Sequence, residues 1–102
     1  MLFPWGLSLF RLAIRIQDND MAPEIKKGDV VIVDAKRDWA AGAFVLVDLG
    51  DRISVRQYIH EQGPRILRPL NPDVMPSHLK ATDTNTILGL VTTVTRDLVG
   101  DV

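Results

Sequence analysis

The chain offers few side chains that could carry out nucleophilic catalysis. It has no cysteine, and its only serines are Ser8, Ser54 and Ser77. A serine nucleophile needs a neighbouring base that takes its proton, such as a histidine or a neutral lysine amine. No lysine lies between Arg37 and Lys80, the part of the chain that contains Ser54. The sequence therefore contains no evident serine–lysine pair.

The two histidines do not form a recognisable catalytic or metal-binding pattern. His60 precedes Glu61, and Asp73 lies five residues before His78. Neither spacing matches a strong metal-ligand template, and neither histidine falls in a triad pattern. The absence of cysteine also excludes disulfides and thiolate metal ligands. We therefore expect neither a metal ion nor another cofactor.

Length and charge narrow the other function classes. The chain has 102 residues, 46% of them hydrophobic, which suits one folded domain. Its formal net charge is −1, and its basic residues are scattered along the chain. A domain that binds DNA by itself normally concentrates positive charge on one face. DNA binding by this domain alone is therefore not expected, and the lack of cysteine fits a cytoplasmic location.

The chain divides into an apolar segment, residues 1–11, and a domain, residues 12–102. No basic region precedes the apolar segment. Arg11 and Arg15 interrupt it before it is long enough to span a membrane. We expect residues 1–11 to be a leader or linker remnant that packs on the core, without membrane contact.

Alternating apolar and polar residues predict strands rather than helices. The strands are predicted at residues 12–16, 30–33, 43–47, 52–59, 65–68 and 87–95. Gly50-Asp51 joins two of them as a short hairpin connection. The one helical piece expected is a turn near residues 21–26. Short strands with Gly and Pro between them predict a mostly-β barrel or sandwich-like domain.

A longer motif follows the first predicted strand. Residues 16–34 read IQDNDMAPEIKKGDVVIVD. This stretch resembles the motif of the self-cleaving repressor family, which includes LexA, the lambdoid phage repressors and UmuD, and whose core is related to that of bacterial signal peptidases. The family motif reads roughly Gly-Asp-Ser-Met-x-Pro-x-Ile, then Gly-Asp-x-Val-x-Val-Asp. The matching positions are Met21, Pro23, Ile25, Gly28, Asp29, Val31, Val33 and Asp34.

The resemblance continues downstream and covers residues 12–95. Residues 44–58 resemble the family hairpin, and residues 70–72 and 87–91 resemble the following loop and the closing strand. The resemblance implies a β-strand-rich, partly open barrel of the LexA and signal-peptidase kind. The motif positions with an expected structural role are Met21, Pro23, Gly28, Asp29 and Asp34.

Both catalytic positions of that family carry other residues in this chain. Asp20 stands at the serine position and Arg56 at the lysine position, while Asp18 replaces a preceding glycine. An arginine stays protonated in proteins and cannot take up a proton. A carboxylate has no proton to lose and is a poor nucleophile toward an amide. We therefore predict a domain without peptidase activity, in which Asp20 and Arg56 form an ion pair, with a bidentate contact as one geometry.

The resemblance implies self-association, because the carboxy-terminal domains of such repressors form dimers. The closing strand is apolar on both faces, so that one face can cover the core while the other face or an exposed edge pairs with a second chain. The expected interface residues are Leu88, Leu90, Thr92 and Val94. The predicted function is the oligomerisation domain, a homodimer or higher oligomer, of a phage or prophage repressor.

Further expectations concern partners. DNA would be bound through an amino-terminal helix-turn-helix that this chain lacks, and induction without self-cleavage would need another route, such as an antirepressor protein. One alternative is a stand-alone accessory protein of the UmuD kind, which binds a polymerase or regulator. Another is a peptidase with displaced catalytic residues, since Ser54 shares a strand face with Arg56.

Overall fold

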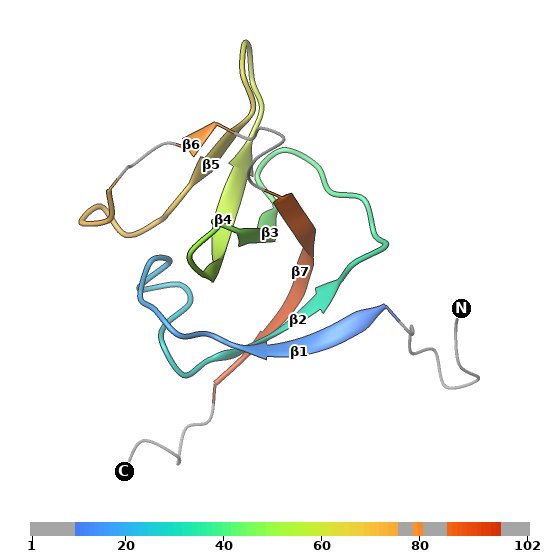
Figure 1. Ribbon diagram of the computed structural model, residues 1–102, viewed down its shortest axis with the longest axis vertical. Helices are drawn as coiled ribbons and strands as arrows, with labels where there is room; N and C mark the ends of the chain where they lie inside the picture. The colour runs from blue at the N-terminus through green and yellow to red at the C-terminus, as the bar shows by residue number, and fades with distance from the viewer. Residues whose placement is uncertain (1–9, 76–78, 81–85, 97–102) are drawn as a thin grey trace.

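The predicted strands form one antiparallel sheet in the computed structural model, which describes residues 10–75, 79–80 and 86–96. The strands are β1 (Arg11–Arg15), β2 (Val30–Asp34), β3 (Phe44–Asp48), β4 (Ile53–Ile59), β5 (Ile66–Arg68), β6 (Leu79–Lys80) and β7 (Thr86–Thr95). Their order across the sheet is β1-β2-β7-β3-β4-β5-β6. The sheet curls around the core but does not close (Figure 1), which confirms the mostly-β, open architecture.

The central hairpin forms as the sequence predicts. β3 pairs with β4 in a continuous register from Phe44↔Gln57 to Asp48↔Ile53. The Leu49 N–H donates to the Arg52 carbonyl at 2.8 Å and closes the connection. Residues 21–26 form a turn rather than a helix of any length. The pairing of β4 with β5 extends the sheet toward the short strand β6, whose two residues are too few to show alternation in the sequence.

The closing strand β7 joins the two halves of the sheet. Its first half pairs with β3 and its second half with β2, and Leu90 lies opposite both Val45 and Asp34. The register shifts once along each pairing. Such bulges bend a strand and increase its twist, which allows β7 to follow the curl of the sheet. β7 therefore lies between β2 and β3 in the sheet order, and Leu90 is the residue that has a strand partner on both sides.

Two hydrophobic clusters lie on opposite faces of β3. Leu46 belongs to the first cluster, whose other buried members include Met21, Ile25, Val31 and Val55. Val45 and Val47 belong to the second, with Tyr58 and Leu67. This division follows from the two-residue period of a strand. The first cluster extends beneath the motif of residues 16–34 and anchors it to the sheet.

The expected leader, residues 1–11, is mostly outside the described residues. The described chain begins at Phe10, and β1 begins at Arg11. β1 is an edge strand, and Leu12 is 60% exposed. Among the described residues, no helix is long and apolar enough to cross a membrane.

Gly89 is expected to be essential for the packing of β7 against β2. A β-carbon built at this position would lie 2.7 Å from the Asp34 carbonyl oxygen and 2.7 Å from Cγ1 of Val33. We expect Gly89→Ala to lower the free energy of unfolding by about 1–3 kcal/mol, because the backbone of β7 or of β2 must shift to make room for the methyl group. Urea denaturation measures this loss. The control is Thr93→Ala, at an exposed position in the same strand, with an expected loss under about 1 kcal/mol. Equal losses in the two variants would show that the close approach of β7 to β2 at Gly89 is unimportant for stability.

Candidate functional site

The loop between β1 and β2 holds Asp20 against the core. The Ile16 N–H donates to the Asp29 carbonyl at 2.8 Å, and the Gly28 N–H donates to the Ile16 carbonyl at 2.9 Å. These bonds close the loop at its base. Met21 and Ile25 are each 1% exposed and pack into the first hydrophobic cluster. The carboxylate of Asp20 is therefore carried on a loop that is fixed at both ends and in its middle.

A second loop fixes the backbone next to Asp20. The Asn71 N–H donates to the Asp20 carbonyl at 3.0 Å, and Asn71 Nδ2 donates to the Asn19 carbonyl at 3.0 Å. Asn19 Oδ1 in turn accepts the Lys27 N–H at 2.9 Å. Asn71 thus acts as a clamp on residues 19 and 20. Residues 70–72 were identified in the sequence only through their resemblance to the family loop, and nothing there predicted this contact.

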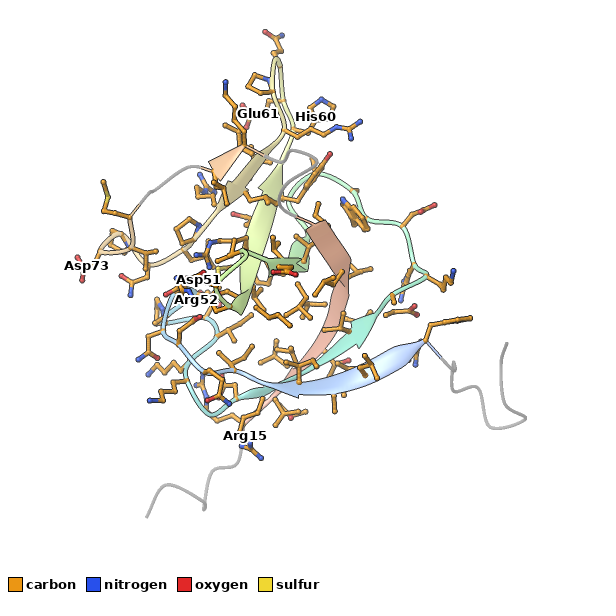
Figure 2. All side chains as sticks on the ribbon, in the orientation of Figure 1. Arg15, Asp51, Arg52, His60, Glu61 and Asp73 are labelled. Atoms are coloured by element: carbon orange, nitrogen blue, oxygen red, sulfur yellow. The ribbon has the colours of Figure 1, made fainter. Side chains whose placement is uncertain are left out.

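Three polar side chains approach Asp20 from β4 and the turn before it. Arg52, Ser54 and Arg56 are spaced two residues apart, so they lie on one face of the extended chain. Ser54 is 3% and Arg56 is 4% exposed, while the Arg52 side chain is 41% exposed. Figure 2 shows Arg52 at the β3–β4 turn, beside the loop that follows β1.

The predicted ion pair between Asp20 and Arg56 is present. Arg56 Nη2 lies 2.9 Å from Asp20 Oδ2. The contact is not bidentate, because Nη1 of Arg56 donates instead to Ser54 Oγ at 2.8 Å and to the Val55 carbonyl at 2.9 Å. The guanidinium is buried, and its donors are distributed over three acceptors. A buried charge needs such compensation for its lost hydration.

Arg52 and Asp18 extend this pair into a network of four charges. Arg52 Nη2 lies 2.8 Å from Asp20 Oδ2, and Nη1 lies 2.9 Å from Asp18 Oδ2. Asp18 Oδ2 also accepts the Ser54 hydroxyl at 2.9 Å. Two carboxylates and two guanidinium groups balance one another. Arg52 was not predicted to belong to the site, although its two-residue spacing from Ser54 and Arg56 matches the spacing of Asp18 and Asp20.

The charges of the network determine the protonation of Arg52. Partial burial lowers its pKa, but the hydrogen bond with Asp20 and the negative charges of Asp20, Asp18 and Asp51 outweigh that effect. The net result is a pKa above the usual arginine value. Arg52 is therefore a permanent cation at the outer side of the network.

The network lacks the groups of a serine–lysine dyad. Ser54 Oγ contacts the carboxylate of Asp18 at 2.9 Å, that of Asp20 at 3.5 Å and the guanidinium of Arg56. None of these groups is a neutral amine that could take up the hydroxyl proton efficiently. The arrangement is suited to holding the two loops and β4 together.

The other motif residues have structural contacts. Met21 is buried, Gly28 has a φ of 95° in the turn before β2, and Pro23 follows a cis peptide bond. Asp34 Oδ1 accepts the Lys36 N–H at 3.0 Å, and its Oδ2 lies 3.5 Å from Nε of Arg11.

Asp29 makes the only bidentate ion pair among the described residues. Arg96 Nε lies 2.9 Å from Asp29 Oδ1, and Arg96 Nη2 lies 2.9 Å from Asp29 Oδ2. The hydrogen bond from Arg96 lowers the pKa of Asp29, burial raises it, and the hydrogen bond from the Lys26 N–H lowers it further, so that the net pKa is below the usual value. The pair ties the end of β7 to the start of β2.

The expected interface residues on β7 do not form one outward face. Leu88 is half-buried and packs against the first hydrophobic cluster. Leu90 and Thr92 are half-buried as well, and Thr92 Oγ1 donates to the Ile32 carbonyl at 3.3 Å. Val94 is 40% exposed. The bulges break the alternation on which the expectation of one shared face was based.

The histidine neighbourhoods do not come together. Figure 2 shows His60 and Glu61 in the β4–β5 connection, away from Asp73, and His78 lies outside the described residues. Across residues 10–75, 79–80 and 86–96, no group of three or more His, Cys, Asp or Glu side chains is arranged to hold a metal ion.

Comparison with known proteins identifies one family. A family model described as Peptidase S24-like matches residues 8–92. This match includes the loop that carries Asp20 and the whole of β4. A search of curated proteins finds no match to the chain.

The buried ion pair predicts strong energetic coupling between Asp20 and Arg56. Asp20→Asn leaves the buried Arg56 without its carboxylate partner and is expected to cost about 3–5 kcal/mol of unfolding free energy. Arg56→Met should cost less, because Asp20 keeps its contact with Arg52 at 2.8 Å. The double substitution should cost less than the sum of the two. Chemical denaturation of the three variants measures the coupling. Arg11→Ala, which removes the longer and more exposed contact with Asp34, is the control, with an expected loss of about 1 kcal/mol or less; additive losses at Asp20 and Arg56 would contradict the coupling.

The lowered pKa of Asp29 predicts acid sensitivity. A carboxyl with a lowered pKa stabilises the fold above its ordinary value of 3.8, and this contribution is lost as the pH falls through the pKa of the folded state. We expect the unfolding free energy of the unsubstituted protein to fall more steeply below that value than that of Asp29→Asn. Denaturation measured across the acid range tests this. The control Asp73→Asn changes an exposed loop carboxyl and should keep the steep dependence; equal slopes for Asp29→Asn and the unsubstituted protein would contradict the prediction.

Proposed function

Because the chain belongs to the peptidase S24-like family, the family of LexA, UmuD and phage repressor carboxy-terminal domains, we propose that it is a member without peptidase activity that serves as the self-association domain of a phage-type transcriptional repressor. The observation that carries the proposal is the buried ion pair between Asp20 and Arg56. These two residues occupy the positions at which the family motif has its serine and lysine.

The chemistry of the pair supports the absence of peptidase activity. A serine–lysine dyad requires a hydroxyl and an amine that can be neutral at working pH. Asp20 offers a carboxylate held by two guanidinium groups, and Arg56 offers a cation that keeps its proton. Each exchange alone removes one half of the reaction. Together they turn a reactive pair into a stabilising contact.

The course of β7 supports self-association. Among the described residues, β2 lies on one side of residues 90–95 of β7, while β3 lies on the other side of residues 86–90. The β3 side of residues 91–95 therefore has no strand neighbour in the described part of the chain. A strand edge of this kind is a template for pairing with a second chain, and the exposed Val94 lies on it.

Self-association has a direct value for a repressor. Two copies of a DNA-binding segment held together contact both halves of a palindromic site, and the second contact benefits from a raised effective concentration. In this proposal the DNA is contacted by a helix-turn-helix outside this domain. Release from DNA then depends on another signal, such as an antirepressor protein, rather than on self-cleavage.

One observation favours a second candidate function, a peptidase that uses Ser54. Its hydroxyl lies 2.9 Å from Asp18 Oδ2, a hydrogen bond that a general base could make. Against this, Ser54 is 3% exposed, and the Asp18 oxygen is shared with Arg52. The structural role of Ser54, as a link between Asp18 and Arg56, therefore accounts better for its contacts.

The proposal predicts a reversible dimer. Sedimentation equilibrium of the protein should show a dimer at micromolar concentrations, and Val94→Asp should shift it to monomer, because a charge on the exposed edge opposes pairing. Leu12→Asp, on the exposed edge strand β1, is the matched control and should leave the dimer intact. A protein that remains a monomer at high micromolar concentration would refute self-association.

The proposal also predicts chemical stability of the chain. Incubation at alkaline pH, which promotes self-cleavage by a lysine base, should leave one intact mass by mass spectrometry. Ser54→Ala should give the same result as the unsubstituted protein. Discrete fragments that disappear with Ser54→Ala would establish the displaced-site peptidase instead.

A further inference from the structure

We infer that Asp18 is a second obstacle to peptidase chemistry, separate from the exchanges at positions 20 and 56. Its carboxylate already accepts the backbone N–H of Asp20, which would have to donate to an oxyanion. This inference rests on the proposed absence of activity and deepens it. It assigns a role to a residue that differs from the family motif and lies outside the catalytic pair.

The contacts of Asp18 support this role. The Asp20 N–H donates to Asp18 Oδ1 at 3.0 Å. The other oxygen, Oδ2, is held by Arg52 Nη1 at 2.9 Å and by the Ser54 hydroxyl at 2.9 Å. The carboxylate is thus fixed at both oxygens, and it cannot rotate away from the N–H without breaking the outer part of the network.

A carboxylate at this N–H opposes acyl transfer. When a side chain attacks a carbonyl, the oxyanion forms close to the backbone N–H of the attacking residue, which commonly serves as one of its donors. In this chain the N–H of Asp20 already donates to a negatively charged oxygen. A developing oxyanion would lose that donor and would lie beside a like charge. Loss of one such donor lowers the rate by about 10²–10³-fold.

Other turn side chains accept a backbone N–H in the same way as Asp18, but Asp18 makes further contacts. The side chains of Asp34, Asp48 and Asn71 each accept the N–H two residues further along the chain. Those contacts are local turn geometry. Asp18 differs because its second oxygen is bonded to Arg52 and Ser54, more than thirty residues away in the chain. The carboxylate is therefore part of the site and not only of a turn.

Asp18 lines a pocket on the protein surface. A pocket of about 520 Å³ is lined by residues that include Ile14, Asp18, Arg52 and Ile53, but not by Asp20 or Arg56. The pocket therefore exposes Asp18 and Arg52, the outer pair of the network, while the inner pair does not line it.

The test compares three variants of the full chain, all of which carry Asp20→Ser and Arg56→Lys. One keeps Asp18, one adds Asp18→Ala, and one adds Asp18→Asn. Each is treated with a fluorophosphonate at alkaline pH. The serine oxygen forms a bond to phosphorus, the phosphorus–fluorine bond breaks, fluoride leaves, and the hydroxyl proton passes to the lysine amine. Intact mass and peptide mapping give the rate and assign the label to position 20 or to Ser54.

The expected result is specific to the acceptor at position 18. Labelling at position 20 should be faster by about tenfold or more with Asp18→Ala than with Asp18 retained. Asp18→Asn keeps an oxygen that accepts the N–H but removes the negative charge, so its rate should lie between those of the other two variants. Equal rates in all three variants, at any level, would overturn the inference. Labelling or fragmentation of the unsubstituted protein would instead refute the proposed absence of activity.

A second measurement does not depend on restoring activity. Amide hydrogen exchange at Asp20 should be about tenfold or more faster with Asp18→Ala than with Asp18→Asn, because only the asparagine keeps the acceptor. Thermal unfolding of both variants checks that the fold is retained. Equal exchange rates in two folded variants would show that the Asp18 carboxylate does not hold this N–H, and would overturn the inference.

Discussion

The contact between Arg56 and Asp20 is the interaction on which the organisation of this site depends. A guanidinium that is 4% exposed has lost its hydration, and only the fixed acceptors around it compensate for that loss. The loop after β1, the Asn71 clamp and the packing of Met21 and Ile25 all hold one of these acceptors in place. The requirement to satisfy one buried cation therefore connects the loop, β4 and the core.

Much of the fold could be predicted from the sequence, because strands that are buried on one face or on both leave a clear pattern. Residues 30–33 and 43–47 lie within or overlap β2 and β3, and the Gly50-Asp51 connection marks the hairpin. The two-residue strand β6 has no such pattern. The bulges in β7 were also not predictable, since they result from the pairing of one strand with two partners. They separate Leu88 from the outward face expected of it.

The contact between Asp20 and Arg56 could be predicted from the sequence, and the contacts of Arg52 and Asp18 could not. A resemblance aligned Asp20 and Arg56, and their opposite charges then predicted the contact. The resemblance gave Arg52 no role and marked Asp18 only as a departure from glycine. Their contacts depend on the placement of the loop after β1 beside the β3–β4 turn, a tertiary property (Figure 2). The two-residue spacing of the charges on both segments was the one signal in the sequence that could have suggested a four-charge network.

The position of β7 in both the sheet and the chain has a consequence for how the molecule is assembled. β7 begins at Thr86, yet it lies between β2 and β3, which are the second and third strands along the chain. Until β7 arrives, β1–β2 and β3–β4 are separate hairpins with no strand to join them. Contacts between such distant parts of a chain slow folding. On the ribosome, the domain therefore gains its native sheet only when most of its residues have been synthesised, and the two hairpins must remain unaggregated until then.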